Sequence, residues 1–171
     1  MNNDLFSAIS RFELMAFFSG YPLIYTLTLV IAGNDLLKEK FIGRTIPLLP
    51  LAYALVGTLF LGFQFKKLFP DYSFEHIRLT IKQPGLVAWG LLSILFWIPT
   101  FNRKTILSLL HSLVFFVLLA PDLFMLLSSQ SADNNMVRND MEVYVNSLLL
   151  NVGAFAVLIT LCYFFPSFKK K

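Results

Sequence analysis

This sequence has little charge and a single cysteine. Charged residues make up 14% of its 171 residues, whereas they make up about 25% of a soluble domain. Hydrophobic residues make up 57%, against roughly 45–50% in a soluble domain. A disordered chain needs the opposite balance and is excluded, and the lone Cys162 excludes a disulfide scaffold. A soluble enzyme domain does not fit this composition. Together with a mean hydropathy of +0.69, it indicates a small polytopic membrane protein.

The sequence also lacks the motifs of the common catalytic and cofactor-binding classes. It contains no phosphate-binding glycine loop, no G-x-S-x-G elbow, no H-E-x-x-H and no C-x-x-C. No second histidine, cysteine or carboxylate lies at helical spacing to complete a metal site around His111. We therefore expect no cofactor, no metal, no nucleic-acid partner and no catalytic activity.

Five apolar windows are long enough to cross a bilayer. A crossing helix needs roughly 20 apolar residues, and open strands would leave backbone groups unpaired in lipid. The predicted fold is therefore all-α, a single bundle of transmembrane helices over residues 1–171 with short loops. Four spans are the alternative to five. The five predicted spans cover residues 14–33, 46–65, 84–101, 105–128 and 143–165.

Prolines and short connections give this arrangement its predicted details. Pro22 follows Gly20 inside the first span and predicts a kink there. Pro84 suits the first turn of the third span, where its missing N–H has no cost. The short connection at residues 102–104 predicts that the third and fourth spans form an antiparallel hairpin.

The lysines and arginines give a small preference for one orientation. Residues 1–10 carry Asp4 but no lysine or arginine, so the first span is expected to be a retained helix rather than a secretory signal. With the N-terminus outside, eight basic residues lie inside and six outside. The positive-inside rule then favours N-out, C-in. The bacterial inner membrane is the default location.

Two connecting segments have a composition of their own. In residues 66–83, Ser73 is placed to cap a short helix with Phe74, Ile77 and Ile81 on one face. This pattern predicts an interfacial helix of about ten residues that contacts anionic lipid or a partner, or simply rests on the membrane surface. Residues 129–142 are polar and acidic without the spacing of a calcium loop, so a solvated loop is predicted.

Two ionisable residues lie inside the predicted spans, where such groups are costly and are default candidates for function. His111 and Asp122 are eleven residues apart, which places them on one face of the fourth helix, about 16.5 Å apart along its axis. Ser108 lies one turn before His111 on that side. Because lipid would disfavour this face, we expect it to point into the bundle.

Each of these residues has a functional and a structural interpretation. In the functional interpretation, Pro121 frees the carbonyl of Val117 close to Asp122 and creates a site for a proton or small cation. Alternatively the helix ends near Ala120 and Asp122 lies among the headgroups. His111 either hydrogen-bonds a neighbouring helix or takes part in a proton relay, and the structural role is favoured.

The remaining polar and small residues in the spans are expected to join helices. Asn151 is the most central amide and needs a partner, for which His111, Asp122 or a tyrosine hydroxyl is expected. Tyr21, Tyr25 and Tyr53 either line a cavity or pack with their hydroxyls bonded. Gly57, Gly62 and Gly153 permit close approach of helices.

Three functions are compatible with these features. The favoured hypothesis is a non-catalytic integral membrane subunit or scaffold of a membrane complex, with lipid and a membrane protein or a second copy as partners. The alternative is a small oligomeric proton- or cation-coupled transporter or channel that uses Asp122 and His111. The third is a membrane enzyme that acts on lipid. The candidate polar site consists of Asp122, His111, Asn151 and Ser108.

Overall fold

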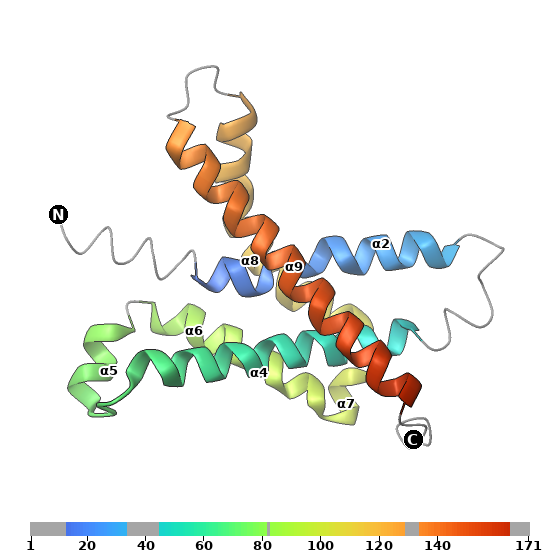
Figure 1. The fold of residues 1–171 in the computed structure, drawn as a ribbon, viewed down its shortest axis with the longest axis horizontal. Coiled ribbons are helices and arrows are strands. Elements are labelled where there is room, and N and C mark those ends of the chain that lie inside the picture. The colour runs from blue at the N-terminus through green and yellow to red at the C-terminus, as the bar shows by residue number, and fades with distance from the viewer. Residues whose placement is uncertain (1–12, 34–44, 82, 129–133, 165–171) are drawn as a thin grey trace.

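The computed structural model describes residues 13–33, 45–81, 83–128 and 134–164. Within these ranges, the side chains of residues 121–123, 125–128, 134–141 and 163 lie outside the description. Every secondary-structure element in the described part is a helix, as predicted (Figure 1). In chain order the elements, with η for a 3-10 helix, are α2 (Tyr21–Gly33), η2 (Ile46–Leu48), α4 (Leu49–Leu68), α5 (Phe74–Thr80), α6 (Pro84–Leu91), η3 (Leu92–Trp97), α7 (Pro99–Asn102), α8 (Thr105–Ser128) and α9 (Asn134–Phe164).

Three helical stretches in the described ranges are long and apolar enough to cross a membrane: Glu13–Ile31, Ile46–Leu68 and Glu142–Cys162. A fourth crossing results if α5 and the helix over Pro84–Trp97 count as one bent span. α8 contributes a shorter apolar stretch, Thr105–Ala120. The helices are compatible with membrane insertion, but the predicted number of five spans is not confirmed.

The first span is broken where the sequence predicts a kink. Residues 13–18 are helical, Ser19 and Gly20 form a turn, and α2 follows. Pro22 accounts for the break, because it has no N–H to donate to the Phe18 carbonyl and its ring crowds the preceding turn. The turn therefore leaves backbone groups that need partners from elsewhere in the fold.

The third predicted span is not one continuous α-helix. α6 passes into the 3-10 helix η3, and Ile98 is extended, with φ −77° and ψ 129°, before α7 begins at Pro99. Pro99 explains this break, because a proline disfavours the α conformation in the residue before it. Where α6 tightens into η3, the Ser93 hydroxyl donates to the Gly90 carbonyl at 2.5 Å.

α5 confirms a helix in the 66–83 segment, although its seven residues make it shorter than predicted. Ser73 is its N-cap, since the Ser73 hydroxyl accepts from the backbone N–H of His76 at 3.3 Å. The predicted apolar face is divided. Ile81, which follows α5, packs against the core, whereas Phe74 is 79% exposed.

α8 and α9 form a hairpin that projects from the rest of the molecule (Figure 1). α8 has the predicted bounds. α9 begins at Asn134 rather than at Val143. The prediction of a solvated loop over residues 129–142 is therefore wrong for residues 134–142, which are helical. Polar composition by itself does not prevent a helix, and residues 134–150 contain neither glycine nor proline.

Aromatic rings fill the core between the first span, α4 and α8. Phe18 is fully buried, and its ring centroid lies 5.2 Å from that of Phe60, 5.7 Å from that of Tyr53 and 4.8 Å from that of Phe115. Contacts of this kind stabilise beyond the area they bury. Phe18 therefore holds three helices together from the residue next to the break.

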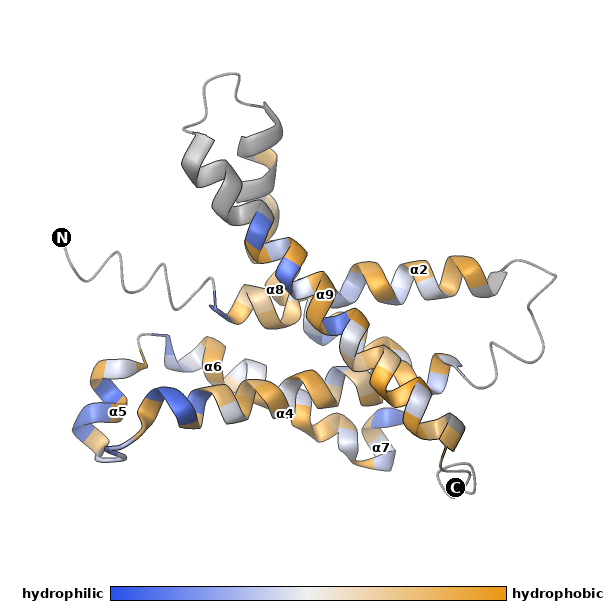
Figure 2. Cartoon of the chain, viewed as in Figure 1, coloured by the Kyte–Doolittle hydropathy of each residue, from blue (hydrophilic) through white to orange (hydrophobic). Residues whose placement is uncertain are grey.

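The first span and α4 run antiparallel. Glu13, at the start of the first span, pairs with Lys67, in the last turn of α4, at 2.7 Å. α5 lies at this end of α4, and α7 lies toward the other end (Figure 1). Figure 2 shows hydrophilic residues at α5 and the adjoining end of α4, whereas the middle of α4 is hydrophobic.

Candidate functional site

His111 lies half-buried on α8 and bonds to two other elements. Its Nδ1 is 2.8 Å from the Tyr53 hydroxyl of α4, and its Nε2 is 2.9 Å from the Trp89 carbonyl of α6. The Trp89 indole stacks on the imidazole with centroids 4.7 Å apart, and its Nε1 donates to the His111 carbonyl at 3.3 Å. These contacts place α8 beside α6, as the predicted hairpin requires.

The contacts of His111 determine its tautomer. A backbone carbonyl only accepts, so Nε2 must carry the proton that is donated to the Trp89 carbonyl. In the neutral ring Nδ1 is then the acceptor, and the Tyr53 hydroxyl donates to it. Both ring nitrogens of His111 are thus occupied by groups of this chain.

Ser108 is fully buried one turn before His111 and also meets a tyrosine. Its hydroxyl donates to the Thr105 carbonyl at 2.6 Å, so the Tyr21 hydroxyl must donate to Ser108, at 2.7 Å. Tyr25 donates to the Thr105 hydroxyl at 3.3 Å. The tyrosines therefore pack with their hydroxyls bonded. We call Tyr21, Tyr25, Tyr53, Ser108 and His111 the tyrosine–histidine cluster.

Asn151 lies outside this cluster. It is 2% exposed on α9, and its Nδ2 donates to the carbonyls of Phe17 and Ser147, each at 2.8 Å. The expectation that His111 or a tyrosine hydroxyl is its partner is wrong, and the side chain of Asp122, the third expected partner, lies outside the described residues. Backbone carbonyls take their place, because the broken first span leaves one of them accessible. Asn151 Oδ1 has no hydrogen-bond partner among the described residues.

A second residue of α9 bonds to the same broken turn. The Ser147 hydroxyl accepts from the backbone N–H of Gly20 at 2.8 Å. At Gly20 the backbones approach so closely that an added Cβ would lie 2.7 Å from the Leu148 backbone nitrogen. We call Ser147 and Asn151 the α9 clamp, because both bond to backbone groups beside the break.

Asp122 is part of α8, and its side chain lies outside the described residues. α8 continues to Ser128, so the alternative in which the helix ends near Ala120 is wrong. The structure therefore brings Ser108 and His111 together and places Asn151 elsewhere. That Asp122 shares a face with His111 stays a prediction.

The serines beside His111 on α8 donate to carbonyls of their own helix. Besides Ser108, the Ser112 hydroxyl donates to a carbonyl of its own helix, that of Leu109, at 2.8 Å. Neither serine donates to His111, so no nucleophile–base pair is formed. No group of three or more His, Cys, Asp or Glu side chains that suits a metal ion is found in the described part of the chain.

Sequence reasoning did not find the roles of Trp89 and Gly20. Trp89 contacts His111 through its indole and accepts from His111 Nε2 with its backbone carbonyl, which carries no residue-specific pattern. Two sequence patterns point to the residues that meet at the break. Gly20 lies two residues before Pro22, and Ser147 lies four residues, about one helical turn, before Asn151. The two patterns lie far apart in the sequence, so only the fold shows that they meet.

Fold and site together define a small all-helical protein with apolar helices and a bonded polar interior. No protein-family model, no curated protein and no solved structure matches the chain.

Proposed function

We propose that this chain is a non-catalytic integral membrane subunit or accessory protein that packs against a membrane-protein partner through α9. The exposure of α9 carries the proposal. Only 22% of its apolar window, Glu142–Cys162, is buried within the chain, against 56% for Glu13–Ile31 and 44% for Ile46–Leu68. Of the three candidate spans in the described ranges, α9 is the one that the chain itself covers least.

The open face of α9 has residues that suit contact with another helix. Asn146, Gly153 and Thr160 lie seven residues apart, and all three are exposed. This spacing keeps them on one side of a helix, where small and polar residues permit close approach and hydrogen bonds in a membrane. An added Cβ at Gly153 would meet no heavy atom within 4 Å, so the surface there is open.

The bonded interior supports a structural role over coupled transport. Both ring nitrogens of His111 and the hydroxyls of Tyr21 and Tyr53 bond within the chain. A proton relay through His111 would first have to break these contacts. We also propose that α8 crosses the membrane, because most of its residues are apolar. The bacterial inner membrane remains the proposed location, and the distribution of lysine and arginine favours N-out, C-in.

The test is purification of the tagged full-length chain from its native membrane in mild detergent, followed by mass spectrometry. Gly153→Leu and Gly62→Leu form a matched pair, because an added Cβ meets open space at both glycines but only Gly153 lies on α9. We expect one stoichiometric membrane-protein partner with the wild type and with Gly62→Leu, and its loss with Gly153→Leu.

Two results would contradict the proposal. A homo-oligomer without any other protein would favour the transporter or channel alternative. Retention of the partner by Gly153→Leu would show that docking does not use α9.

A further inference from the structure

Large apolar side chains are exposed at one end of the molecule, where α4 ends and α5 follows. Their exposed fractions run from 53% for Tyr72 to 79% for Phe74. Such a concentration of exposed aromatic residues marks an interaction surface. We call this surface the α5 platform; its apolar residues are Phe65, Phe69, Tyr72, Phe74 and Leu79.

The α5 platform lies across the direction of the crossing helices. α5 is bent by 96° from the helix over Pro84–Trp97. Figure 1 shows it standing across the end of α4, where Figure 2 shows the change from hydrophobic to hydrophilic residues. If α4 crosses a bilayer, α5 lies along the bilayer surface at the depth where the headgroups begin.

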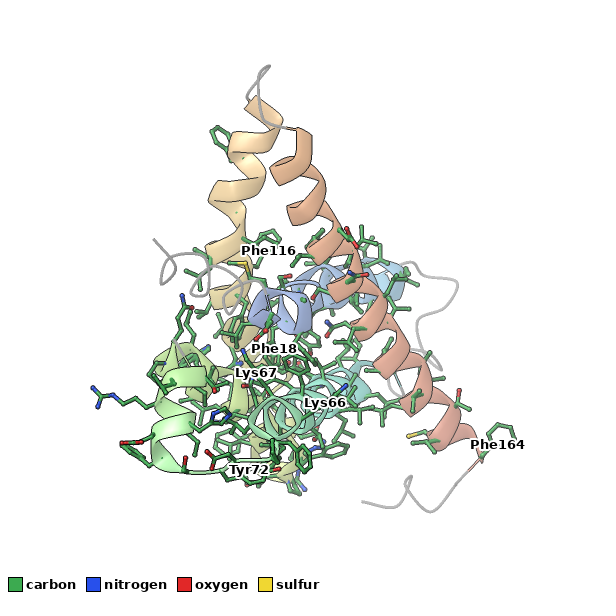
Figure 3. The ribbon with its side chains drawn as sticks, turned by 60° about the vertical axis from the view of Figure 1, so that its left-hand side comes forward. Phe18, Lys66, Lys67, Tyr72, Phe116 and Phe164 are labelled. Atoms are coloured by element: carbon green, nitrogen blue, oxygen red, sulfur yellow. The ribbon has the colours of Figure 1, made fainter. Side chains whose placement is uncertain are left out.

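Free cations accompany these aromatic residues. Lys66 and Arg78 are exposed, and neither forms an ion pair within the described ranges, whereas Lys67 is paired with Glu13. In Figure 3, Lys66 and Tyr72 lie around the end of α4. A membrane-interface segment typically places aromatic rings at the acyl boundary, while its basic groups reach into the headgroups.

The acidic residues near Lys66 and Arg78 indicate which part of a lipid headgroup this surface can bind. Asp71 and Glu75 offset much of the positive charge, so the surface is not strongly cationic. The Asp71 carboxylate is occupied, because it accepts from the Ser73 backbone N–H at 2.8 Å and from its hydroxyl at 2.9 Å. Lys66 and Arg78 therefore suit the phosphate common to all phospholipids rather than a specifically anionic headgroup.

We infer that the α5 platform lies in the headgroup layer of a phospholipid leaflet, with its aromatic rings at the acyl boundary and Lys66 and Arg78 beside lipid phosphates. This inference rests on the membrane location in the proposed function. It names lipid, rather than a second protein, as the partner of this end of the chain.

Spin-label depth measurements on the full chain in phosphatidylcholine vesicles test the inference. A Cys162→Ala background removes the native thiol, and Phe74→Cys, Leu79→Cys and Leu59→Cys introduce single labels at exposed positions. The depth of each spin label is measured from the ratio of its collision rates with oxygen, which enters the acyl region, and with a water-soluble nickel complex, which does not. We expect labels at 74 and 79 within about 5–10 Å of the headgroup boundary, and the label at 59, in the middle of α4, deepest.

The label at position 59 separates failure of this inference from failure of the membrane location. A deep label at 59 with water-exposed labels at 74 and 79 overturns the platform alone. Protection of positions 74 and 79 from both reagents overturns it as well, because a protein then covers α5. A label at 59 that is open to the nickel complex overturns the membrane location too.

Charge-removing variants test the role of the cations. Lys66→Gln with Arg78→Gln should shift the label at 74 toward the aqueous collision ratio. Arg103→Gln with Lys104→Gln is the matched control, because it removes the same charge beside α7, toward the other end of α4. Equal shifts for both pairs, or no shift for the first, would overturn the phosphate contact.

Discussion

The backbone N–H of Gly20 donates to the hydroxyl of Ser147 at 2.8 Å and so joins two residues 127 positions apart. One turn further along α9, Asn151 donates to the Phe17 carbonyl at 2.8 Å. Both backbone groups lie beside the break that Pro22 causes. In a membrane no water would replace these bonds, so the α9 clamp fixes how the first span and α9 pack.

Gly20→Ala should destabilise the fold. The new Cβ would lie 2.7 Å from the Leu148 backbone nitrogen, so α9 would have to move. We expect a loss of about 1–3 kcal/mol in the free energy of unfolding, as for overpacking in a core. Denaturation of the purified protein in mild detergent, followed by circular dichroism, measures it. Gly62→Ala, where the added Cβ meets open space, should be neutral or slightly stabilising, and equal losses for both would contradict the close approach.

Asn151→Ala should weaken the packing of α9 on the first span. The variant removes the donor to the Phe17 carbonyl and leaves that partly buried acceptor without it. The expected cost is about 0.6 kcal/mol and at most about 1.7 kcal/mol, the average and the largest value for hydrogen bonds between membrane helices. The same denaturation assay applies, with Asn146→Ala as control, because Asn146 is exposed on the same helix. If the two variants behave alike, the clamp has no role in stability.

Tyr53→Phe should destabilise the protein by about 0.5–1.5 kcal/mol, because His111 Nδ1 loses its donor. Tyr25→Phe breaks a longer bond, of 3.3 Å, and should cost less. Nitrogen-15 chemical shifts of the His111 ring give an independent test at neutral pH. They should show the tautomer with the proton on Nε2, and a proton on Nδ1 would contradict the bond from Tyr53.

Asp122→Asn separates the proposed subunit from the transport alternative. A structural subunit should give vesicles with no pH-dependent proton or cation flux, before or after this substitution. The measurement is flux from reconstituted vesicles that carry a pH-sensitive dye. Flux in the wild type that Asp122→Asn abolishes, with the fold intact by circular dichroism, would favour the transporter instead.

The turn before α5 should be stable at neutral pH and lost only in acid. Hydrogen bonds from the Ser73 backbone N–H, and then from its hydroxyl, lower the pKa of the Asp71 carboxyl below its usual value. A lowered pKa stabilises the fold above the unfolded value of about 3.9, and this contribution disappears as the pH falls through the lowered pKa.

The mobility of the spin label at position 74 follows this transition. It should stay constant from pH 7 to about pH 5 and rise only below about pH 4. Asp71→Asn should remove the acid step. A step near pH 6 would assign the change to another group.

Periodicity and prolines alone predict several parts of this fold correctly. Apolar windows predict the bounds of α8, Ser73 predicts the start of α5, and Pro22 predicts the break in the first span. These features are local, because a helix needs only the hydrogen-bond ladder and side chains within its own turns. The predictions that were drawn from composition alone were wrong at two places. Polar residues 134–142 are helical, and Pro99 breaks the span that was expected to be continuous.

The contacts between helices were decided by the tertiary structure alone. Composition indicated that polar groups inside the spans would bond between helices, and His111 and Ser108 do so. It could not indicate that Tyr53 and Trp89 meet His111, or that Asn151 bonds to the Phe17 carbonyl instead of a side chain. A buried polar group bonds to whatever donor or acceptor the packing brings within reach, and that depends on where a distant helix crosses. The sequence by itself determined the bounds of α8, the start of α5 and where the first span breaks; only the packing of α9 on that break determined which atoms replace the lost bonds.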